Sequence, residues 1–457
     1  NVVDATGSSL REALAAAATA AADAPPSLEQ LAAAARTVVA REDREYSGFA
    51  AGPGFETPKF PNTPVLRFLQ HPALTADAPD AADVASRALS AMARSDLHDL
   101  VEGGFFRYAT RRDWSVPHYE RMLTDNAGLV EVALAAGDDA VATDAARFLV
   151  DVLQLPSGGI AAAQDSESVI DGVRTEGGYY RASDRSGLQP PALDAKVVTG
   201  WNGHAIAALA AAGTRTDPRF LEAARWAADA VLESNVADDG TLRRASLDEV
   251  RSAASATLED YGGLARGLLA LARATGEVAY ASRARALVDL CLGADGIHPP
   301  GGGDPVLVAQ GMQSHAVPTD GASPSGPSVF AAAALDLWRL GAGEPYRTAA
   351  ETLVRAAADA ALASPLAHGA ILEVALGLVS APRQLVVVGE TDAEIAEAAR
   401  RAAADVVAVV SPAQALAFAE AGFTLFEGKV ALGGEATAYD CRAFACALPT
   451  TDAGRLG

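Results

Sequence analysis

Side chains that could do chemistry are concentrated in one stretch, residues 103–126, which reads GGFFRYATRRDWSVPHYERMLTDN. His118 is the only histidine of the chain that lies inside a dense motif of polar and aromatic residues. Aromatic rings flanked by carboxylates, arginines and amides suit a polyhydroxylated ligand, because rings stack on its C–H faces and polar groups bind its hydroxyls. The candidate binding residues in this stretch are Arg107, Tyr108, Trp114, Glu120 and Asp125.

Further polar and aromatic candidates lie in the loops that precede predicted helices. Asp and Asn are preferred N-cap residues, so capping explains any one of these acids and amides as well as chemistry does. If the helices stand side by side and point the same way, their starts converge on one rim around an axial pocket. The candidates in these loops are Asp165, Glu167, Lys196, Trp201, Asn202, Glu259, Asp260, Tyr261 and Asp320.

Two enzymatic reactions fit these residues. In the first, His118 is a general base that removes a proton next to a sugar carbonyl, and a carboxylate or a second histidine returns it. That reaction is epimerisation or aldose–ketose isomerisation. In the second, two carboxylates such as Asp165 and Asp260 act as acid and base on a glycosidic bond, with Glu167 as a further catalytic candidate.

A third function is not enzymatic, because the same rim could bind a glycan or a peptide as a docking surface. The aromatic residues would then plug the centre of the ring. An open pocket lined by His118, Asp165, Trp201 and Asp260 favours an enzyme. A pocket plugged by Trp114 or Tyr261 favours a scaffold.

Composition and charge restrict the possible partners. The 457 residues carry 36 basic and 58 acidic side chains, a net charge of −22, so nucleic acid and anionic membrane surfaces are poor partners. Apolar stretches are interrupted before they reach about 18 residues, which indicates no transmembrane helix, and we expect a cytoplasmic protein. No metal-ligand spacing such as H-E-x-x-H is present, so we expect neither a metal nor a cofactor.

A repeated unit accounts for most of the chain. Residues 202–232, 260–292 and 325–354 each predict a helix, a short turn with an aromatic residue and a second helix, and 125–153 is similar. Six such hairpins fit an (α/α)6 toroid over residues 1–381, or an open superhelix of the same hairpins. The twelve predicted helices are 27–41, 62–70, 83–97, 124–136, 139–154, 202–213, 218–233, 260–275, 277–293, 325–341, 344–362 and 366–380.

The pattern changes after Pro382. A β-rich run at 384–388, a helical segment at 392–403 and a second β-rich run at 405–410 predict a β-α-β unit. A helix at 412–421 and strand-like pieces at 423–426 and 436–440 complete a small α/β module, residues 382–457. We expect the three cysteines to be reduced and mostly buried, with an exposed pair of Cys441 and Cys446 as the alternative.

Several long motifs together resemble a known family. They are Gly104-Phe105-x-Arg107-Tyr108, Trp114-x-Val116-Pro117-His118-Tyr119-Glu120-x-Met122-Leu123-x-Asp125-Asn126, Gln164-Asp165-Ser166-Glu167-Ser168, Asp194-x-Lys196-Val197-x-Thr199-x-Trp201-Asn202-Gly203, Leu258-Glu259-Asp260-Tyr261 and Asp320-Gly321-x-x-Pro324-Ser325-Gly326. These motifs resemble the thioredoxin-domain-containing YyaL family, which is related to spermatogenesis-associated proteins. The resemblance runs from the segment that begins Gly54-Phe55 to the tail motif Cys441-Arg442-x-Phe444-x-Cys446.

The resemblance implies a thioredoxin-like domain followed by an (α/α)6 toroid similar to N-acylglucosamine 2-epimerases and six-hairpin glycosidases. This chain has no Cys-x-x-Cys pair, so we expect it to be the toroid portion, with a thioredoxin-like domain before Asn1 as a candidate partner. It departs from the family at Glu167, Pro327 and Tyr119, where Asp, Asn and Phe are usual, and in a short connection at 181–193. The resemblance implies a fold more directly than a reaction.

Overall fold

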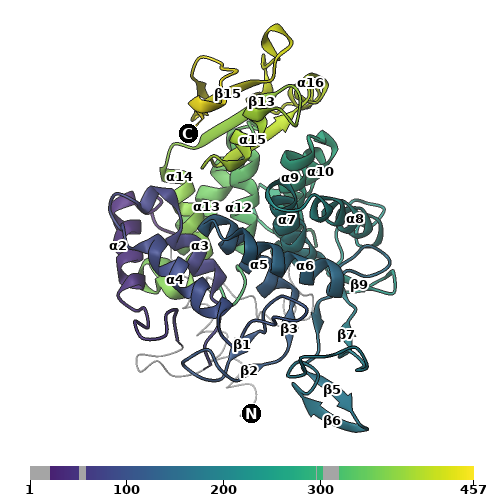
Figure 1. The fold of residues 1–457 in the computed structure, drawn as a ribbon. Helices are drawn as coiled ribbons and strands as arrows, with labels where there is room; N and C mark the ends of the chain where they lie inside the picture. The colour runs from purple at the N-terminus through teal and green to yellow at the C-terminus, as the bar shows by residue number, and fades with distance from the viewer. Residues whose placement is uncertain (1–20, 51–57, 295, 302–318, 457) are drawn as a thin grey trace, which may run out of the picture.

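Six helical hairpins form a closed ring in the computed structural model, which describes residues 21–50, 58–294, 296–301 and 319–456 (Figure 1). The inner helices are α3 (Thr63–Leu69), α5 (Leu123–Ala136), α7 (Thr199–Arg215), α9 (Leu258–Thr275), α12 (Gly326–Arg339) and α14 (Gly369–Val379). The outer helices are α2 (Leu28–Val39), α4 (Ala81–Ala93), α6 (Asp139–Phe148), α8 (Arg219–Ser234), α10 (Val278–Asp289) and α13 (Glu344–Ala363). Each inner helix packs on the next, and α14 packs on α3, so the ring is closed. The predicted (α/α)6 toroid is confirmed, and its alternative, an open superhelix, is not.

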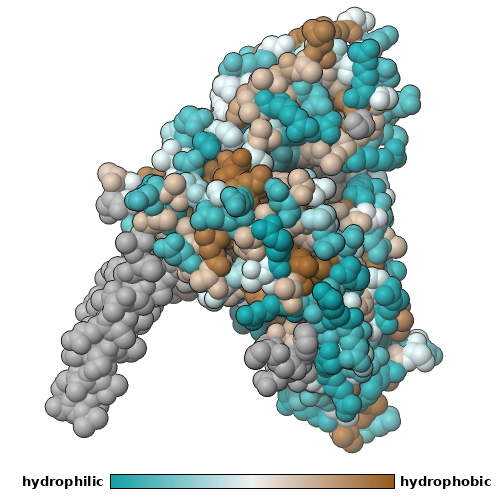
Figure 2. All heavy atoms as spheres, turned by 90° about the vertical axis from the view of Figure 1, so that its left-hand side faces the viewer, coloured by the Kyte–Doolittle hydropathy of each residue, from teal (hydrophilic) through white to brown (hydrophobic). Residues whose placement is uncertain are grey.

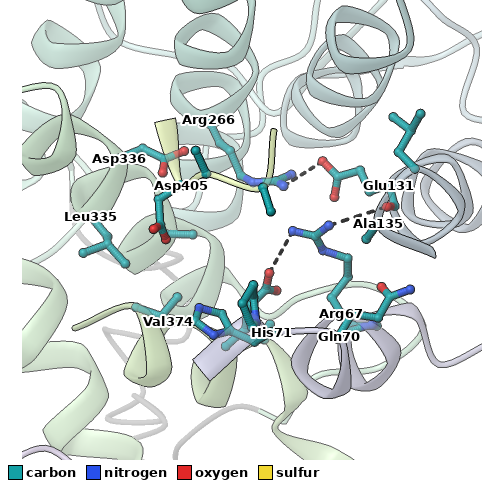
Figure 3. Close-up of a pocket in the computed structure, with 18 of the residues that line it drawn as sticks. Arg67, Gln70, His71, Glu131, Ala135, Arg266, Leu335, Asp336, Val374 and Asp405 are labelled. Carbon is teal, nitrogen blue, oxygen red and sulfur yellow. Dashed lines mark hydrogen bonds and ion pairs between the residues drawn. The ribbon is translucent and has the colours of Figure 1, made fainter. Parts of the chain in front are cut away.

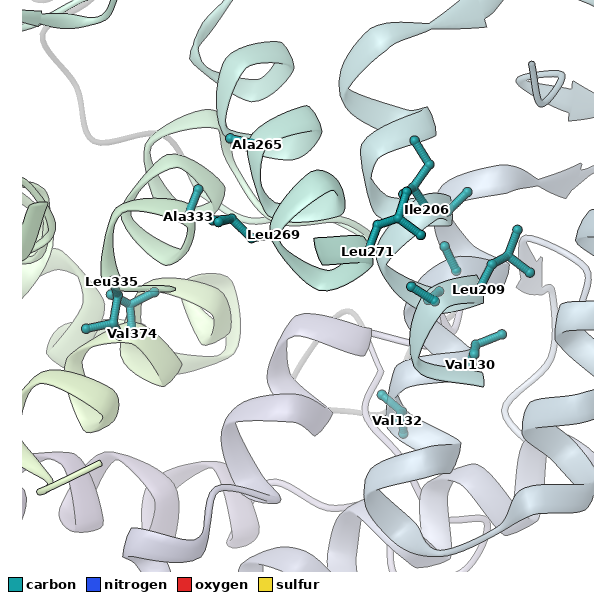
Figure 4. Close-up of a cluster of buried hydrophobic side chains, with 14 of the residues drawn as sticks. Val130, Val132, Ile206, Leu209, Ala265, Leu269, Leu271, Ala333, Leu335 and Val374 are labelled. Atoms are coloured by element: carbon teal, nitrogen blue, oxygen red, sulfur yellow. The ribbon is translucent and has the colours of Figure 1, made fainter. Parts of the chain in front are cut away.

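The two rings differ in how their helices bury apolar residues. The outer helix α8 buries one stripe, which includes Phe220, Ala224 and Val231, and exposes its other face. The inner helix α7 is buried on nearly every side, because it has neighbours in both rings. Figure 4 shows inner-ring side chains such as Ile206 of α7 and Leu271 of α9 meeting in one continuous core.

The closest contact between inner helices depends on glycine. A Cβ atom on Gly203 of α7 would lie 2.2 Å from the backbone of Gly263 in α9, and one on Gly267 would lie 2.5 Å from the Gly203 carbonyl oxygen. No side chain fits between these two backbones. The many small residues of the sequence therefore set the narrow spacing of the inner ring.

Short strands lie in the long loops that lead into the inner helices, on the lower side of the ring in Figure 1. They are too short to show an alternating pattern, so the sequence predicts only loops here. The paired strands are β1 (Tyr108–Ala109) with β2 (Pro117–His118), β3 (Arg121–Met122) with β4 (Ala163–Gln164) and β7 (Leu193–Asp194), β5 (Glu167–Ile170) with β6 (Val173–Glu176), β8 (Val197–Val198) with β9 (Ala245–Leu247) and β10 (Val250–Arg251), and β11 (Leu292–Gly293) with β12 (Gly296–Ile297).

The C-terminal residues form a sheet that lies above the ring in Figure 1. Its strands follow the order β14 (Val406–Val410), β13 (Arg383–Val388), β15 (Thr437–Arg442), β16 (Ala445–Cys446), and β13 pairs with β14 in parallel. With α15 (Glu394–Arg401) between them, these strands are the predicted β-α-β unit, and α16 (Pro412–Glu420) follows. One face of the sheet joins the core of the toroid and the other packs on α15. The division of the chain at residues 381 and 382 stays a prediction.

Two local predictions are wrong. The strand-like piece at 423–426 contains a 3-10 helix, Thr424–Phe426, because Phe423 and Phe426 both turn inward to pack on Phe418. Cys441 and Cys446 form a disulfide between β15 and β16, whereas the sequence favours reduced thiols. A turn in which two residues have positive φ angles sets the two cysteines opposite each other, which their spacing does not reveal. Cys291 is free and buried, as predicted.

No helix in the described ranges combines the length and the hydrophobicity needed to cross a bilayer. A cytoplasmic location stays a prediction. The start of the family-like region, Gly54-Phe55, lies outside the described residues.

Candidate functional site

A cluster of the predicted site residues forms where β1 and β2 lead into α5. Tyr108 is paired with His118 across the two strands, and the two rings are stacked with centroids 5.0 Å apart. The Arg107 guanidinium donates to Glu120 at 2.7 Å, and the backbone N–H of Arg107 donates to the Glu120 carbonyl oxygen. We call Arg107, Tyr108, His118, Glu120 and Asp125 the rim cluster.

His118 lies between two carboxylates. Its Nδ1 is 3.0 Å from Oε1 of Glu176, and its Nε2 is 3.7 Å from Oε2 of Glu120. Its side chain is 28% exposed, so the ring is accessible to a ligand. A carboxylate that accepts a hydrogen bond from Nδ1 leaves Nε2 as the basic nitrogen. The sequence did not reveal Glu176, which β6 brings from 58 residues away.

Asp125 is the buried member of the rim cluster. It is the third residue of α5 and only 2% exposed, and its Oδ2 has no hydrogen-bond partner within the described part of the chain. Burial raises the pKa of Asp125 to about 7, helped by the negative Glu120 and opposed by Arg107. A carboxyl group that titrates near neutral pH can act as a general acid or base.

Asn126 holds the rim cluster against α5. Its side-chain oxygen accepts from the Phe105 N–H at 2.7 Å, and its amide donates to the Phe105 carbonyl at 3.0 Å. Asn202, at the same place in α7, makes the same pair of bonds to Ile160, at 2.8 and 3.0 Å. Asn202 is fully buried, so its geometry is that of a positioning residue. Its predicted contact with a substrate stays a prediction.

A second group of predicted residues surrounds Arg244, which the sequence did not reveal. Arg244 Nη1 donates to Glu259 at 2.8 Å and to Asp260 at 2.9 Å, and the Trp201 indole N–H donates to Glu259 at 3.1 Å. Asp260 also accepts from the N–H groups of Gly200 and Thr257. Burial raises the pKa of Asp260, and the positive charge of Arg244 opposes that rise. Both oxygens of Asp260 therefore have protein partners: Oδ2 belongs to the capping box of α9, and Oδ1 accepts from Gly200 in α7.

The predicted aromatic plug residues lie in the walls of the ring. Trp114 is buried, donates from Nε1 to the Tyr46 carbonyl at 2.9 Å, and has the Lys59 ammonium 4.6 Å from its ring centroid. The Tyr261 hydroxyl accepts from the Leu242 N–H at 3.0 Å. Neither Trp114 nor Tyr261 lines the axial cavity described below.

Most of the remaining predicted charged residues have partners away from the rim cluster, but Glu167 lies opposite Glu176, the partner of His118, across β5 and β6. Lys196 pairs with Asp194 at 2.9 Å on the surface, and Glu167 pairs with Arg174 across the β5–β6 hairpin. Asp320 accepts from the N–H groups of Ser325 and Ala370 at 2.8 Å. Asp165 is exposed whereas Asp260 is fully buried, so their use as a pair on a glycosidic bond has no support in this geometry.

An axial cavity of about 900 Å³ runs inside the inner ring (Figure 3). Side chains of all six inner helices line it, and it begins at Thr124, next to Asp125, and ends against the C-terminal module. None of the predicted site residues lines it. An axial pocket is therefore present, but other residues than the predicted ones line it.

Ionised side chains cross the middle of the axial cavity. Arg67 pairs with Glu373 at 2.9 Å and Arg266 with Glu131 at 2.6 Å, as the dashed lines in Figure 3 show. Burial and the charge of Arg266 lower the pKa of the neighbouring His204 to about 4, so its imidazole is neutral at pH 7. In the sequence, these buried ion pairs are indicated by a single charged residue inside an apolar run, as in LVEVAL around Glu131 and ILEVAL around Glu373.

Within the described ranges, no group of three or more His, Cys, Asp and Glu side chains is arranged to hold a metal ion.

Comparison with known proteins identifies relatives over part of the chain. No protein-family model matches the sequence. Spermatogenesis-associated protein 20 of Mus musculus is 38% identical over 147 residues, 30% of this chain and 18% of that protein. The Homo sapiens protein is 38% identical over 152 residues, 30% of this chain and 19% of that protein. The matched region therefore spans less than a fifth of the length of these relatives.

Solved structures share the architecture of the ring. A cellobiose 2-epimerase from Spirochaeta thermophila has a TM-score of 0.51 and 15% identity, with 78% of this chain and 86% of that chain covered. A sugar epimerase from a ruminal bacterium has a TM-score of 0.52 and 12% identity, with 76% and 86% covered. Likeness at this identity shows the fold alone. The chain is thus related to spermatogenesis-associated protein 20 over about 30% of its length, as its motifs predict, and it has the (α/α)6 toroid fold of these epimerases.

Proposed function

We propose that this protein is a sugar epimerase or isomerase whose reaction takes place at the rim cluster. The observation that carries the proposal is the pairing of two different proton-transfer groups at one place. His118 is accessible and oriented by Glu176, and Asp125 is buried with a pKa of about 7. The names of proteins with the same fold, which include a D-mannose isomerase, support a sugar as the substrate.

The proposed reaction removes one proton from an open-chain sugar and delivers another to it. Nε2 of His118 removes the proton from the carbon next to the carbonyl, and the electron pair of that C–H bond moves to the carbonyl oxygen as an enediolate. The Arg107 guanidinium stabilises the negative oxygen. Protonated Asp125 then returns a proton, to the opposite face of the same carbon for epimerisation or to the neighbouring carbon for isomerisation.

The pKa of Asp125 sets a pH dependence for this reaction. Asp125 must be protonated to donate, and its pKa is about 7. We therefore expect turnover to fall as the pH rises above about 7.

Deuterium exchange tests the proposal directly. The protein is incubated in D₂O with mannose, fructose, glucose and cellobiose, and proton NMR measures loss of the C–H signal next to the carbonyl, which is C2–H of the aldoses and C1–H of fructose. Wild type should exchange at least one sugar, and His118→Ala and Asp125→Asn should each slow exchange by about 10²–10⁴-fold. His298→Ala, an exposed histidine away from the rim cluster, should keep the wild-type rate.

Two results would contradict the proposal. One is a folded wild-type protein that exchanges none of these sugars. The other is an unchanged exchange rate in His118→Ala, which would remove His118 as the base.

A non-catalytic scaffold is the second candidate function. It is favoured by the structural use of Trp114, Asn202 and Asp260, whose polar groups bind the protein's own backbone or side chains. Under this proposal the rim binds a glycan, a peptide or a thioredoxin-like domain without turnover. Binding of a sugar that raises the melting temperature, with no exchange in D₂O, would favour it.

A further inference from the structure

The far end of the axial cavity carries an unusual concentration of positive charge. Nine arginines and four carboxylates line the whole cavity, and three of the arginines also pair with carboxylates outside the lining, Arg215 with Asp139, Arg383 with Asp440 and Arg401 with Glu397. The complete chain has a net charge of −22. Arginines are therefore concentrated around this cavity of a strongly acidic protein, although Arg401 and Arg442 are exposed at its edge.

Both parts of the molecule contribute to this end of the cavity. Arg273 comes from α9 and Arg339 from α12, where the inner helices end. Arg400 and Arg401 come from the end of α15, and Arg442 from the end of β15. The arginines thus face a space between the toroid and the C-terminal module.

The nearby carboxylates neutralise only part of this charge. Asp405 pairs with Arg339 at 2.7 Å, but Asp336 lies 3.5 Å from Arg339 and 3.7 Å from Arg273. Arg442 makes no ion pair with any described residue. Arg400 donates to the Thr391 carbonyl and Arg401 pairs with Glu397, so the guanidinium N–H groups left for a ligand belong mainly to Arg273 and Arg442.

Unpartnered buried atoms point to an occupant of the same cavity. His204 Nε2, Gln70 Oε1 and Arg339 Nε are buried and have no hydrogen-bond partner among the described residues. His204 is only 7% exposed and lines the cavity. Buried polar atoms of folded proteins are nearly always hydrogen-bonded to protein or to water, so these three atoms are available to bind a polar ligand in the cavity.

We propose that this end of the axial cavity binds a small, multiply charged oxyanion, whose phosphate or carboxylate groups are held by Arg273, Arg339 and the arginines of the C-terminal module. Guanidinium groups bind both kinds of oxyanion through paired N–H···O bonds. A pocket between two structural units is a common place for a ligand. This site is separate from the rim cluster, and it adds a binding function that the proposed sugar reaction does not require.

Calorimetric titration of the full chain tests the proposal with three probes at low salt. The probes are pyrophosphate, citrate and uncharged glucose. At least one oxyanion should bind and raise the melting temperature, and higher salt should weaken it. Binding of pyrophosphate alone indicates a phosphate-bearing ligand, and binding of citrate alone indicates a polycarboxylate. Absence of binding by both oxyanions overturns the proposal, whatever the sugar exchange at the rim cluster shows.

Two substitutions with opposite expected effects locate the site. The ion pair of Arg273 with Asp336 is long, at 3.7 Å, so we expect Arg273→Gln to keep the fold. Loss of its positive charge should lower the oxyanion affinity about tenfold. Asp336→Asn frees Arg273 and Arg339 from a competing carboxylate, so affinity should rise about threefold. Arg94→Gln, an exposed arginine bonded to Ser90 of its own helix, is the control and should change nothing. Unchanged affinity in Arg273→Gln, or weaker binding in a folded Asp336→Asn, contradicts the proposed site.

Discussion

Asp125 and Asp260 occupy the same position in two inner helices and behave in opposite ways. Each is the third residue of its helix, α5 or α9, and each is almost completely buried. Asp260 accepts hydrogen bonds from two backbone N–H groups and from Arg244. Asp125 has a free Oδ2 within the described part of the chain. One carboxylate holds the fold together, and the other is available for proton transfer.

The residue before each helix explains the difference. Thr257 precedes α9 and forms a capping box with Asp260, in which the backbone N–H of Thr257 is available to the carboxylate. Met122 precedes α5, has no hydroxyl group, and belongs to strand β3, where it pairs with Ala163. The same position in two helices can therefore have different roles, depending on whether the backbone N–H of the N-cap residue is available to the carboxylate.

The largest effect is expected from Asp260→Ala. The substitution removes the acceptor for Gly200, Thr257 and Arg244 in the interior, so we expect a loss of about 3 kcal/mol in the free energy of unfolding. Urea denaturation measures it. Glu259→Ala, the matched change at the neighbouring and partly exposed carboxylate, should cost less than about 1 kcal/mol. Equal losses of unfolding free energy in the two variants would show that the hydrogen bonds of Asp260 contribute no more to stability than those of Glu259.

Asp125→Asn should act in the opposite direction. The pKa of Asp125 is about 7 in the folded state, above the value of about 3.9 expected in the unfolded chain, so wild-type stability falls as the pH rises from about 4 to 7. Asparagine does not ionise, so the variant should be more stable than wild type at pH 8 and should lose this pH dependence.

Urea titrations at pH 5 and pH 8 compare these stabilities. Asp171→Asn, in an exposed turn, is the control and should leave the pH dependence unchanged. Destabilisation of Asp125→Asn at pH 8 would mean that Asp125 is a structural carboxylate like Asp260.

Asp320→Asn should have the smallest effect of the three. Asp320 uses both oxygens, one for the Ser325 N–H and one for the Ala370 N–H, and asparagine keeps only one acceptor. One backbone N–H loses its partner, so we expect a loss of about 1 kcal/mol by urea denaturation. A loss as large as that of Asp260→Ala would place Asp320 in the same structural class.

The helices could be predicted from the sequence because their apolar residues recur with a helical period. The segment predicted at 260–275 is α9 at Leu258–Thr275, and the one predicted at 344–362 is α13 at Glu344–Ala363. The disulfide and the short strands were missed, because turn geometry and two-residue pairings leave no periodic pattern.

The candidate site was predictable only where its residues are close in sequence. The motif from Arg107 to Asp125 folds into one cluster, so its spacing was informative. The sequence did not separate the role of Asp125 from that of Asp260, because both follow the same helix-start pattern. An axial pocket was predicted, but the residues that line it were missed because its ion pairs join distant segments, as Arg266 and Glu131 do across 135 residues.

Closure of the ring has a consequence for how the chain folds as it is synthesised. The last inner helix, α14, packs on the first, α3, and Arg67 meets Glu373 across 306 residues. Until α14 leaves the ribosome, the exposed side of α3 has no neighbour, and the nascent chain carries an open hydrophobic seam. Contacts of such high sequence separation form late and slowly. Fluorescent labels on α3 and α14 would therefore report the last step of folding, after the hairpins between them have formed.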